Sequence, residues 1–422
     1  MIKILHMADT HVSHRKSKNV RDVWKIPNTI SWIEDDYCLA FKRAIDIAIK
    51  SGCDYLVHAG DLFDVPVARN LTSPTEYSRS FVIRELNRFF KATDYKVPFI
   101  VIDGNHGTYL NRNSSTLEFL EAAFPDMVHI ATNYHLKEAI MKGEPLVKSF
   151  DDVNFYLFPY LRFNITERLE KAYAEWVETY QQPDDSKTSI AVVHGMSYGI
   201  DLHQRILQLP YDYIALGHDH NQKRITKKAW QAGSTEKYTF AERNQKKGVL
   251  EVQVIHNKDP IVVPHILPSS REMVQFDIQL NFDRDLIELE KKVDDLIKKF
   301  QEPFNGDTAK RIKLNFLGNI FFSTWWRLEE KLTEMQHKIL TQDYNILEFR
   351  WETTELIKTV PENKRPSALT KDYLIEDPIK DFEGYIRRMN LPDPEKAKLL
   401  IDRGAKIIQV VFGTHLLDKG EE

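Results

Sequence analysis

The residue types best suited to metal chemistry lie in five short motifs, each directly after an apolar segment that is expected to form a strand. In open α/β sheets the carboxyl ends of the strands bind ligands, so side chains at these positions can meet. Glycines beside several of them let backbone and substrate approach closely. The motifs are Asp9 and His11 after Ile2–Met7, Gly60-Asp61 after Tyr55–Ala59, Gly104-Asn105-His106 after Pro98–Ile102, His194-Gly195 after Ser189–Val193, and Gly217-His218-Asp219-His220 after Tyr213–Leu216.

Such a set of carboxylates, imidazoles and a carboxamide suits two divalent cations held side by side. Two metal ions roughly 3.5–4 Å apart can share one carboxylate and clamp a phosphate between them. A mixture of oxygen and nitrogen ligands favours Mn²⁺, Fe or Zn²⁺ over Mg²⁺ and Ca²⁺, which prefer oxygen. Each motif alone is common in turns, but the ordered series is not expected by chance. The sequence therefore predicts a metal-dependent phosphoesterase.

The bulk composition is that of a globular protein, with 42% hydrophobic and 28% charged residues among 422. We find no apolar run of 18 residues and no signal peptide, so we expect no membrane span. Only two cysteines occur, Cys38 and Cys53, which argues against a disulfide framework and favours a reducing, cytoplasmic location. The net charge of −4 excludes a wholly basic DNA-binding surface but allows a local basic patch.

Strand and helix patterns alternate through the first 260 or so residues. This alternation predicts a mixed α/β core whose strands are buried on both faces. Besides the strands already given, we expect strands at Phe155–Pro159, Val249–Ile255 and Pro260–Pro264. The expected helices are Asp36–Ser51, Ser78–Phe90, Thr116–Phe124 and Arg168–Tyr180.

Near residue 270 the pattern changes to a compact βαβαβ unit. Its expected elements are the strand Arg271–Leu280, the helix Leu286–Phe300, the strand Arg311–Phe316, the helix Trp325–Ile339 and the strand Asn345–Trp351. A linker rich in proline and charge follows, and then two helical patterns, Ile379–Met389 and Asp393–Arg403. We therefore expect three regions: 1–268, 269–355 and 356–422.

In order and type the five motifs resemble those of the calcineurin-like metallophosphoesterases and, among these, the SbcD-type double-strand-break repair nucleases. Ala59-Gly60-Asp61-Leu62-Phe63 matches the AGDLF pattern of the nucleases, and Gly233-Ser234-Thr235-Glu236-Lys237, with Phe240 and Gly248 after it, is similar to their GSxER stretch. The resemblance spans roughly residues 1–351. It implies an α/β (α+β) fold, a four-layer αββα sandwich with a small βαβαβ capping domain that helps to position DNA, and C-terminal helices.

Carried over motif by motif, the resemblance implies two sets of metal ligands, most simply for Mn²⁺. One ion would be bound by Asp9, His11, Asp61 and His220, and the other by Asp61, Asn105, His194 and His218, so that Asp61 bridges both. His106 would face the substrate, protonate the leaving oxygen and stabilise charge in the transition state.

Two departures from the family pattern concern this histidine. The family usually has an acidic residue where Gly107 follows the GNH motif, and some members have a histidine at the position of Asp64. These changes leave the metal ligands intact, but they bear on the rate of cleavage and on substrate preference.

Two basic clusters could hold DNA phosphates, and each such contact would make binding more sensitive to salt. The alternative for both is a solvated loop. The first cluster follows the DxH motif and consists of Arg15, Lys16, Lys18, Arg21 and Lys25. The second follows the GHxH motif and consists of Lys223, Arg224, Lys227 and Lys228, of which Lys223 and Arg224 are the candidate contacts.

The resemblance also implies partners. Nucleases of this family are homodimers whose C-terminal helices bind the base of a coiled coil on an SMC-like ATPase of the SbcC type. Ile379, Phe382, Ile386 and Met389 recur at helical spacing and would offer an apolar stripe, either to such a partner or to the chain's own domain.

The leading hypothesis is a manganese-dependent DNA nuclease in double-strand-break repair: an exonuclease, with or without endonuclease activity, in the cytoplasm or nucleoid. A phosphatase or a cyclic-nucleotide phosphodiesterase on the same fold is the first alternative. A weakly active DNA-binding scaffold is the second.

Overall fold

The computed structural model of the chain describes residues 1–14, 19–21, 24–26, 30–64, 74–106, 115–196, 198–282, 286–359, 379, 382–383, 386–387, 395 and 398–405. Two compact units can be distinguished. The larger comprises Met1–Leu280, Arg284–Leu317 and Glu329–Glu355, and the smaller comprises Asn281–Asp283, Gly318–Leu328 and Leu356–Glu422. Among the described helices, none has the length and apolar character that a bilayer crossing requires.

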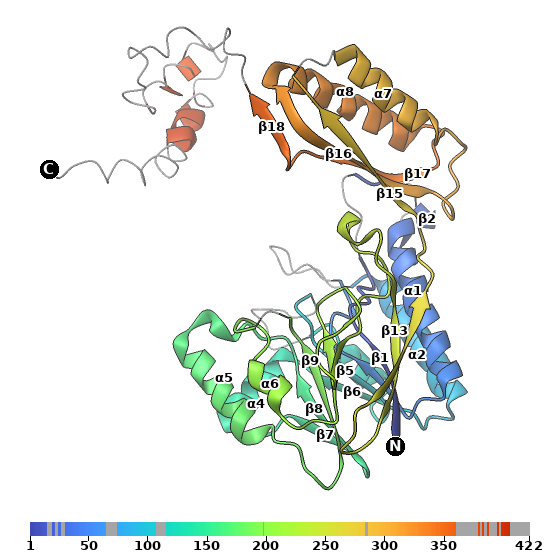
Figure 1. Ribbon diagram of the computed structural model, residues 1–422, viewed down its shortest axis with the longest axis vertical. Coiled ribbons are helices and arrows are strands. Elements are labelled where there is room, and N and C mark those ends of the chain that lie inside the picture. The colour runs from blue at the N-terminus through green and yellow to red at the C-terminus, as the bar shows by residue number, and fades with distance from the viewer. Residues whose placement is uncertain are drawn as a thin grey trace, which may run out of the picture. The chain divides into compact units, whose positions relative to one another are not determined.

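Two six-stranded sheets form the centre of the larger unit (Figure 1). The first has the order β14-β13-β1-β4-β5-β6, and β1, β4, β5 and β6 are parallel to one another. The second has the order β11-β12-β10-β9-β8-β7, in which β8, β9, β10 and β12 are parallel. The strands of the first sheet are β1 (Ile2–Met7), β4 (Tyr55–His58), β5 (Phe99–Ile102), β6 (Val128–Ala131), β13 (Lys247–Val254) and β14 (Ile261–Leu267). Those of the second are β7 (Val147–Ser149), β8 (Val153–Phe158), β9 (Thr188–His194), β10 (Tyr213–Gly217), β11 (Lys223–Arg224) and β12 (Ala229–Gln231).

Side chains alternate along the strands between two apolar interfaces. In β1, Leu5 and Met7 pack in the cluster that includes the first three helices, whereas Ile2 and Ile4 pack against the second sheet. Successive residues of a strand point to opposite faces, so a strand buried on both sides needs a continuous apolar run. The outer face of the first sheet is covered by α1 (Trp32–Ser51), α2 (Glu76–Ala92) and α3 (Glu118–Ala123).

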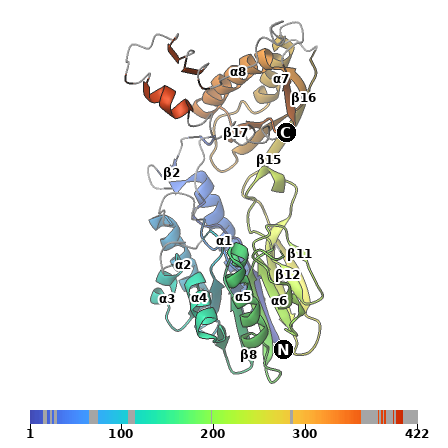
Figure 2. The same cartoon turned by 90° about the vertical axis from the view of Figure 1, so that its left-hand side faces the viewer.

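The outer face of the second sheet has its own apolar cluster, in which Trp176 and Tyr173 of α5 pack near Phe158. The helices on this side are α4 (Asn133–Lys142), α5 (Glu167–Tyr180) and α6 (Gln204–Gln208), which face the viewer in Figure 2. Helices, sheet, sheet and helices therefore follow one another, which confirms the expected αββα sandwich.

Helix α4 was not among the expected helices, although its ends carry clear signals. The Thr132 side chain accepts a hydrogen bond from His135 N, and the His135 ring accepts one from Thr132 N. Gly143, in the left-handed region at φ 64°, ends the helix. The short strands β6, β7, β11 and β12 were also missed, because two to four residues carry too little periodicity to be recognised.

The expected strand-helix-strand-helix-strand order after residue 270 is confirmed as β15 (Met273–Leu280), α7 (Leu286–Lys298), β16 (Lys310–Phe321), α8 (Phe322–Thr341) and β17 (Ile346–Glu352). β16 is longer than expected because its second half pairs in parallel with a further strand, β18 (Leu356–Thr359). The boundaries that we predicted after residues 268 and 355 stay predictions.

Within the larger unit, the segment after the DxH motif is tied to residues beyond position 300. Val20 packs in one apolar cluster with Tyr37 and Leu347. The Arg21 side chain is 5% exposed, and its guanidinium lies 2.5–3.1 Å from the carbonyl oxygens of Ile339, Gln342, Tyr344 and Ile346. Burial of a charge is costly unless hydrogen bonds surround it, so these carbonyls account for the buried position of Arg21.

Candidate metal centre

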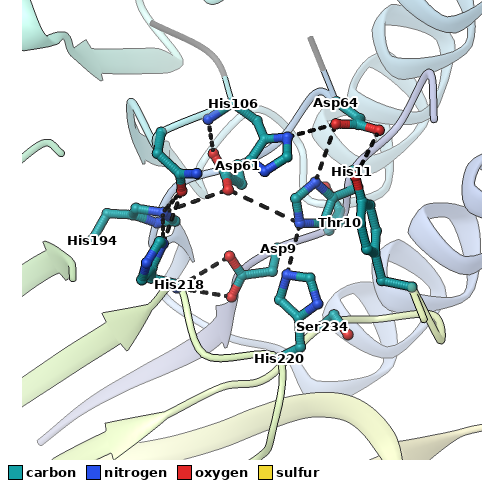
Figure 3. Close-up of polar contacts among 12 residues, drawn as sticks. Asp9, Thr10, His11, Asp61, Asp64, His106, His194, His218, His220 and Ser234 are labelled. Carbon is teal, nitrogen blue, oxygen red and sulfur yellow. Dashed lines mark hydrogen bonds and ion pairs between the residues drawn. The ribbon is translucent and has the colours of Figure 1, made fainter. Parts of the chain in front are cut away.

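The five motifs converge at the carboxyl ends of β1, β4, β5, β9 and β10. The first three strands are neighbours in one sheet and the other two are neighbours in the second, so the motifs meet where the two sheets face each other. Figure 3 shows Asp9, His11, Asp61, His194 and His218 around a common centre, with His220 completing the ring. Side chains from five strands thus point at one small volume.

The backbone around this centre is held in conformations that most residues avoid. Asp9, His11, Asp61 and His218 all have positive φ values, of 49°, 45°, 54° and 90°. Such values cost free energy for residues other than glycine and persist where the surroundings enforce them. Here hydrogen bonds from Asp9 N to Gly60 O and from His11 N to Asp61 O, both of 3.0 Å, join the first two motifs.

Two glycines leave the space that the ligand side chains fill. A Cβ at Gly60, whose φ is 94°, would lie 2.1 Å from His194 Nδ1. A Cβ at Gly104 would lie 2.0 Å from Asp61 Oδ1. Neither distance is sterically possible, so both positions require glycine for the observed side-chain arrangement.

Among the described residues three groups of potential ligand atoms can be distinguished, one of which is formed by His11, Asp64 and His106 and the other two by the predicted ligands. Asp9, His11 and His220 offer one set of atoms within 4.8 Å of one another, and Asp61, His194 and His218 offer another. In the first group, His11 Nε2 and His220 Nε2 are only 3.0 Å apart. Two ring nitrogens that face each other at this distance can share at most one proton, and a cation between them would bind both lone pairs.

Asn105 and Asp61 complete the arrangement. Asn105 Oδ1 lies 3.0 Å from His194 Nε2 and 2.8 Å from His218 Nδ1. Asp61 Oδ2 is 3.5 Å from His194 Nε2 in the second group and 4.0 Å from His11 Nε2 in the first. All seven residues that the sequence suggested as ligands are therefore brought together, with Asp61 between the two groups. Oxygen and imidazole nitrogen atoms gathered in this way fit divalent cations such as Mn²⁺ or Zn²⁺.

Burial perturbs the titration of these groups. Burial raises the pKa of Asp9 to about 6. Burial alone would lower the pKa of His194, but attraction to Asp61 raises it to about 9. A proton on His194 thus supplies positive charge beside the buried Asp61 carboxylate, which is the role that a bound cation would take over.

A second set of contacts orients the imidazoles. His194 Nδ1 lies 2.8 Å from Ala59 O, and His220 Nδ1 lies 3.1 Å from Glu242 Oε1. Glu242 is held in turn by the buried Lys247, whose Nζ is 2.6 Å from Glu242 Oε2. Partners of this kind fix the ring orientation and the tautomer of metal-binding histidines. The sequence analysis did not include Glu242, which follows the GS stretch without a motif of its own.

His106 is held by a carboxylate that the sequence analysis noted only as a departure. His106 Nδ1 lies 2.6 Å from Asp64 Oδ1, and His14 Nδ1 lies 2.5 Å from Asp64 Oδ2. The Tyr238 hydroxyl also donates to Asp64 Oδ2, over 3.2 Å. Although burial raises the pKa of Asp64, its hydrogen bonds to the two histidines lower it far below its usual value, so this carboxylate stays ionised. Gly107 lies outside the described residues.

The residues suggested for DNA binding differ in placement. Arg15, Lys16 and Lys18 lie outside the described residues, and Arg21 is buried among carbonyl oxygens. Lys223 and Arg224 form the exposed strand β11, where Lys223 pairs with Asp219. Among the suggested DNA-binding residues that the structure describes, solvent can therefore reach Lys223 and Arg224.

The chain matches the family model described as calcineurin-like phosphoesterase over residues 2–222. Among curated proteins it is similar to "DNA double-strand break repair protein Mre11" from several archaea. With the Saccharolobus solfataricus protein it is 28% identical over 54% of this chain and 51% of the relative, so here the chain spans about half of the relative's length. With the Thermoplasma acidophilum protein it is 24% identical over 92% of this chain and 97% of the relative. With the Sulfolobus acidocaldarius protein it is 22% identical over 95% and 94%.

Among solved structures, a dimetal phosphatase from Danio rerio matches with a TM-score of 0.34 and 10% identity, over 62% of this chain and 95% of that chain. Similarity at this level says nothing about a shared substrate.

Replacing Glu242 tests whether its carboxylate orients a metal ligand. Glu242→Gln keeps the size of the side chain but removes the charge that faces His220 Nδ1. We expect the affinity for Mn²⁺ to fall by about 10–100-fold, as measured by calorimetric titration of the metal-free protein. Glu251→Gln is the matched control, because it removes the same charge beside His265, 3.0 Å away on the first sheet. Equal affinities of the two variants would contradict the assigned role.

Proposed function

The chain belongs to the calcineurin-like phosphoesterase family, and on that premise we propose that it is a two-metal, manganese-dependent nuclease that hydrolyses phosphodiester bonds in DNA. The observation that carries this proposal is the convergence of seven candidate ligand side chains from five strands on one small, partly buried volume. Asp9, His11, Asp61 and His220 would bind one ion. Asp61, Asn105, His194 and His218 would bind the other.

When bound, two such ions polarise the phosphate and supply a water of lowered pKa as the nucleophile. The chain's own residues have the remaining tasks. Asp61 lies between both ligand groups and would hold the ions at a fixed separation. His106 N donates to Asp61 Oδ1 over 2.8 Å, which fixes the catalytic histidine relative to the bridging carboxylate.

His106 is proposed as the general acid that protonates the leaving oxygen. Burial lowers the pKa of His106, but the hydrogen bond to Asp64 and the charges of Asp61 and Asp64 raise it above its ordinary value. Asp64 accepts a hydrogen bond from Nδ1–H of the imidazolium, so Nε2–H is left to donate to the substrate. Asp64 would thereby orient His106, as the acidic residue after the GNH motif would in the family pattern, and this supports an active enzyme despite Gly107.

The choice of DNA as the substrate is supported by the relatives. Two of the similar Mre11 proteins align over more than nine tenths of both chains, so the likeness includes the elements after residue 270 as well as the phosphoesterase part. We propose Lys223 and Arg224 as phosphate contacts, because both are exposed and follow the GHxH motif directly. Activity on DNA would place the protein with the chromosome in the cytoplasm. A phosphatase or a cyclic-nucleotide phosphodiesterase is the alternative.

Digestion of linear double-stranded DNA with Mn²⁺ separates these functions. We expect the wild type to degrade DNA with a higher kcat/KM than it shows for bis(4-nitrophenyl) phosphate, because the elements after residue 270 would contribute binding only to a polymer. Asp61→Ala should lose activity on both substrates. Asp126→Ala, an exposed carboxylate before β6, is the control and should match the wild type. Hydrolysis of the small phosphodiester without digestion of DNA would favour the alternative.

A double-mutant cycle tests whether Asp64 and His106 act as one unit. Asp64→Asn and His106→Asn should each lower kcat by about 10²–10⁴-fold, and the double variant should lose little more than either. The acid must carry a proton, so activity falls as pH rises through the pKa of His106. Without the Asp64 charge that pKa is lower, and the fall should begin at lower pH.

The control for the cycle is His14→Asn, which removes the other imidazole from Asp64 and leaves the 2.6 Å contact to His106. It should reduce kcat far less. Unchanged cleavage by His106→Asn would contradict the proposed role of His106 as the acid. Strictly multiplicative losses in the double variant would contradict the proposal that Asp64 and His106 act as one unit.

We further propose that the chain forms a homodimer and binds an SMC-like coiled-coil ATPase of the SbcC type through residues 379–403. Support comes from the similarity to Mre11 proteins over nearly the whole chain. Of the four stripe residues, Ile379, Phe382 and Ile386 are described as helical, and Met389 lies outside the described residues. We expect twice the chain mass by light scattering at micromolar concentration. A monomer mass would contradict the dimer.

A further inference from the structure

An apolar surface adjoins the candidate metal centre on the side of β9. Immediately after His194 and Gly195, the chain forms a short loop in which Met196, Tyr198 and Ile200 are 46%, 58% and 37% exposed. Single exposed apolar residues are common on protein surfaces. Three within five positions, directly after a proposed metal ligand, are not explained by packing and mark a contact surface.

The loop is anchored without these three side chains. Met196 N donates to Asp201 Oδ1 over 3.0 Å, and Gly199 N donates to Leu202 O over 3.3 Å. Leu202 is 2% exposed and packs in the cluster beneath the second sheet. Since the fold buries Leu202 and leaves the Met196 and Tyr198 side chains in solvent, the latter two are available to a ligand.

The same anchor reaches the metal centre. Asp201 Oδ2 lies 3.7 Å from His218 Nε2, on the side of the ring away from Asn105. Tyr160 contacts both imidazoles, with its ring centroid 5.9 Å from that of His218 and 6.1 Å from that of His194. The loop thus contacts His218 through Asp201, and Met196 follows the proposed ligand His194 by only two positions, so the loop borders the candidate metal centre.

A second segment extends the surface and adds charge. Phe163 N donates to Ile200 O over 3.1 Å, which joins the loop to the turn around residues 162–165. In this turn Ile165 is 67% exposed, and Arg162 is exposed too. Arg162 contacts Asn164 and forms no ion pair with any residue that the structure describes. The surface therefore combines exposed apolar side chains, one of them aromatic, with an unneutralised cation.

This combination matches an unpaired nucleotide. A base has an apolar face that stacks on aromatic and aliphatic side chains, and the linked phosphate is an anion that a guanidinium binds. A base inside a paired duplex has its faces covered by neighbouring bases, so it cannot use such a surface unless it is unstacked. We propose that Met196, Tyr198, Ile200, Ile165 and Arg162 hold the unstacked bases beside the scissile phosphate. Frayed or single-stranded ends are then cleaved in preference to paired DNA.

This proposal rests on the proposed nuclease function, and its test compares three substrates with Mn²⁺: a single-stranded oligonucleotide, a blunt duplex of the same sequence and bis(4-nitrophenyl) phosphate. Tyr198→Ala is expected to lower kcat/KM for the single strand by about tenfold, the loss of one base stack. Activity on the small phosphodiester should stay within about twofold of wild type, because that substrate is too short to reach the loop. Tyr198→Phe keeps the ring and should retain the wild-type rate.

Tyr95→Ala is the matched control. Tyr95 is 50% exposed, but it precedes β5 and so lies at the amino ends of the strands, away from the centre. A second readout is independent of cleavage: in EDTA, an oligonucleotide with 2-aminopurine near its end should be quenched on binding to the wild type and to Tyr95→Ala, and less so with Tyr198→Ala.

Equal kcat/KM and equal quenching for wild type and Tyr198→Ala would overturn the proposal. A change in molecular mass on Tyr198→Ala, with unchanged DNA cleavage, would also overturn it and assign the surface to contacts between chains. If the wild type hydrolyses the small phosphodiester but neither binds nor cleaves any oligonucleotide, the nuclease function fails and this proposal fails with it. If the wild type cleaves DNA and Tyr198→Ala cleaves it equally well, the loop proposal alone fails.

Discussion

The structure of the larger unit depends on one electrostatic constraint: the fully buried negative charge of Asp61. An isolated carboxylate in a protein interior is strongly unfavourable, and it is retained only where positive charge and hydrogen-bond donors surround it. Around Asp61 these are the His194 ring and the amide of His106. They come from strands of both sheets, so the sandwich must close before the charge is neutralised. A divalent cation on either side of Asp61 would satisfy the same requirement more fully.

The sandwich pays for this arrangement in local backbone strain. Asp9 and His11 adopt left-handed conformations, and Gly60 and Gly104 give up side chains that would collide with His194 and Asp61. Such strain is tolerable because the apolar interfaces beneath it are extensive and the strands that end at the centre are buried on both faces. The apolar burial between the layers stabilises the fold, and part of this stabilising free energy offsets the backbone strain at the edge where the layers meet.

Asp64 gives His106 a carboxylate partner although this chain departs from the family pattern after the GNH motif. The acidic residue expected after the GNH motif is replaced by Gly107, yet His106 has a carboxylate partner at 2.6 Å. That carboxylate also contacts His14 and Tyr238, so it is fixed from three sides.

The sequence by itself predicted a mixed α/β core and the gathering of the candidate ligands, because each motif follows an apolar strand and parallel strands bring their ends to one edge, whereas the four-layer sandwich was implied by the family resemblance. It did not determine which side chains support those ligands. His106 and Asp64 are 42 residues apart and His220 and Glu242 are 22 apart, and no periodicity or motif links either pair. Arg21 was expected to face DNA, but it is buried against carbonyl oxygens more than 300 positions away. Such contacts are set by how the layers pack and by the need to neutralise buried charge, and both are properties of the folded chain alone.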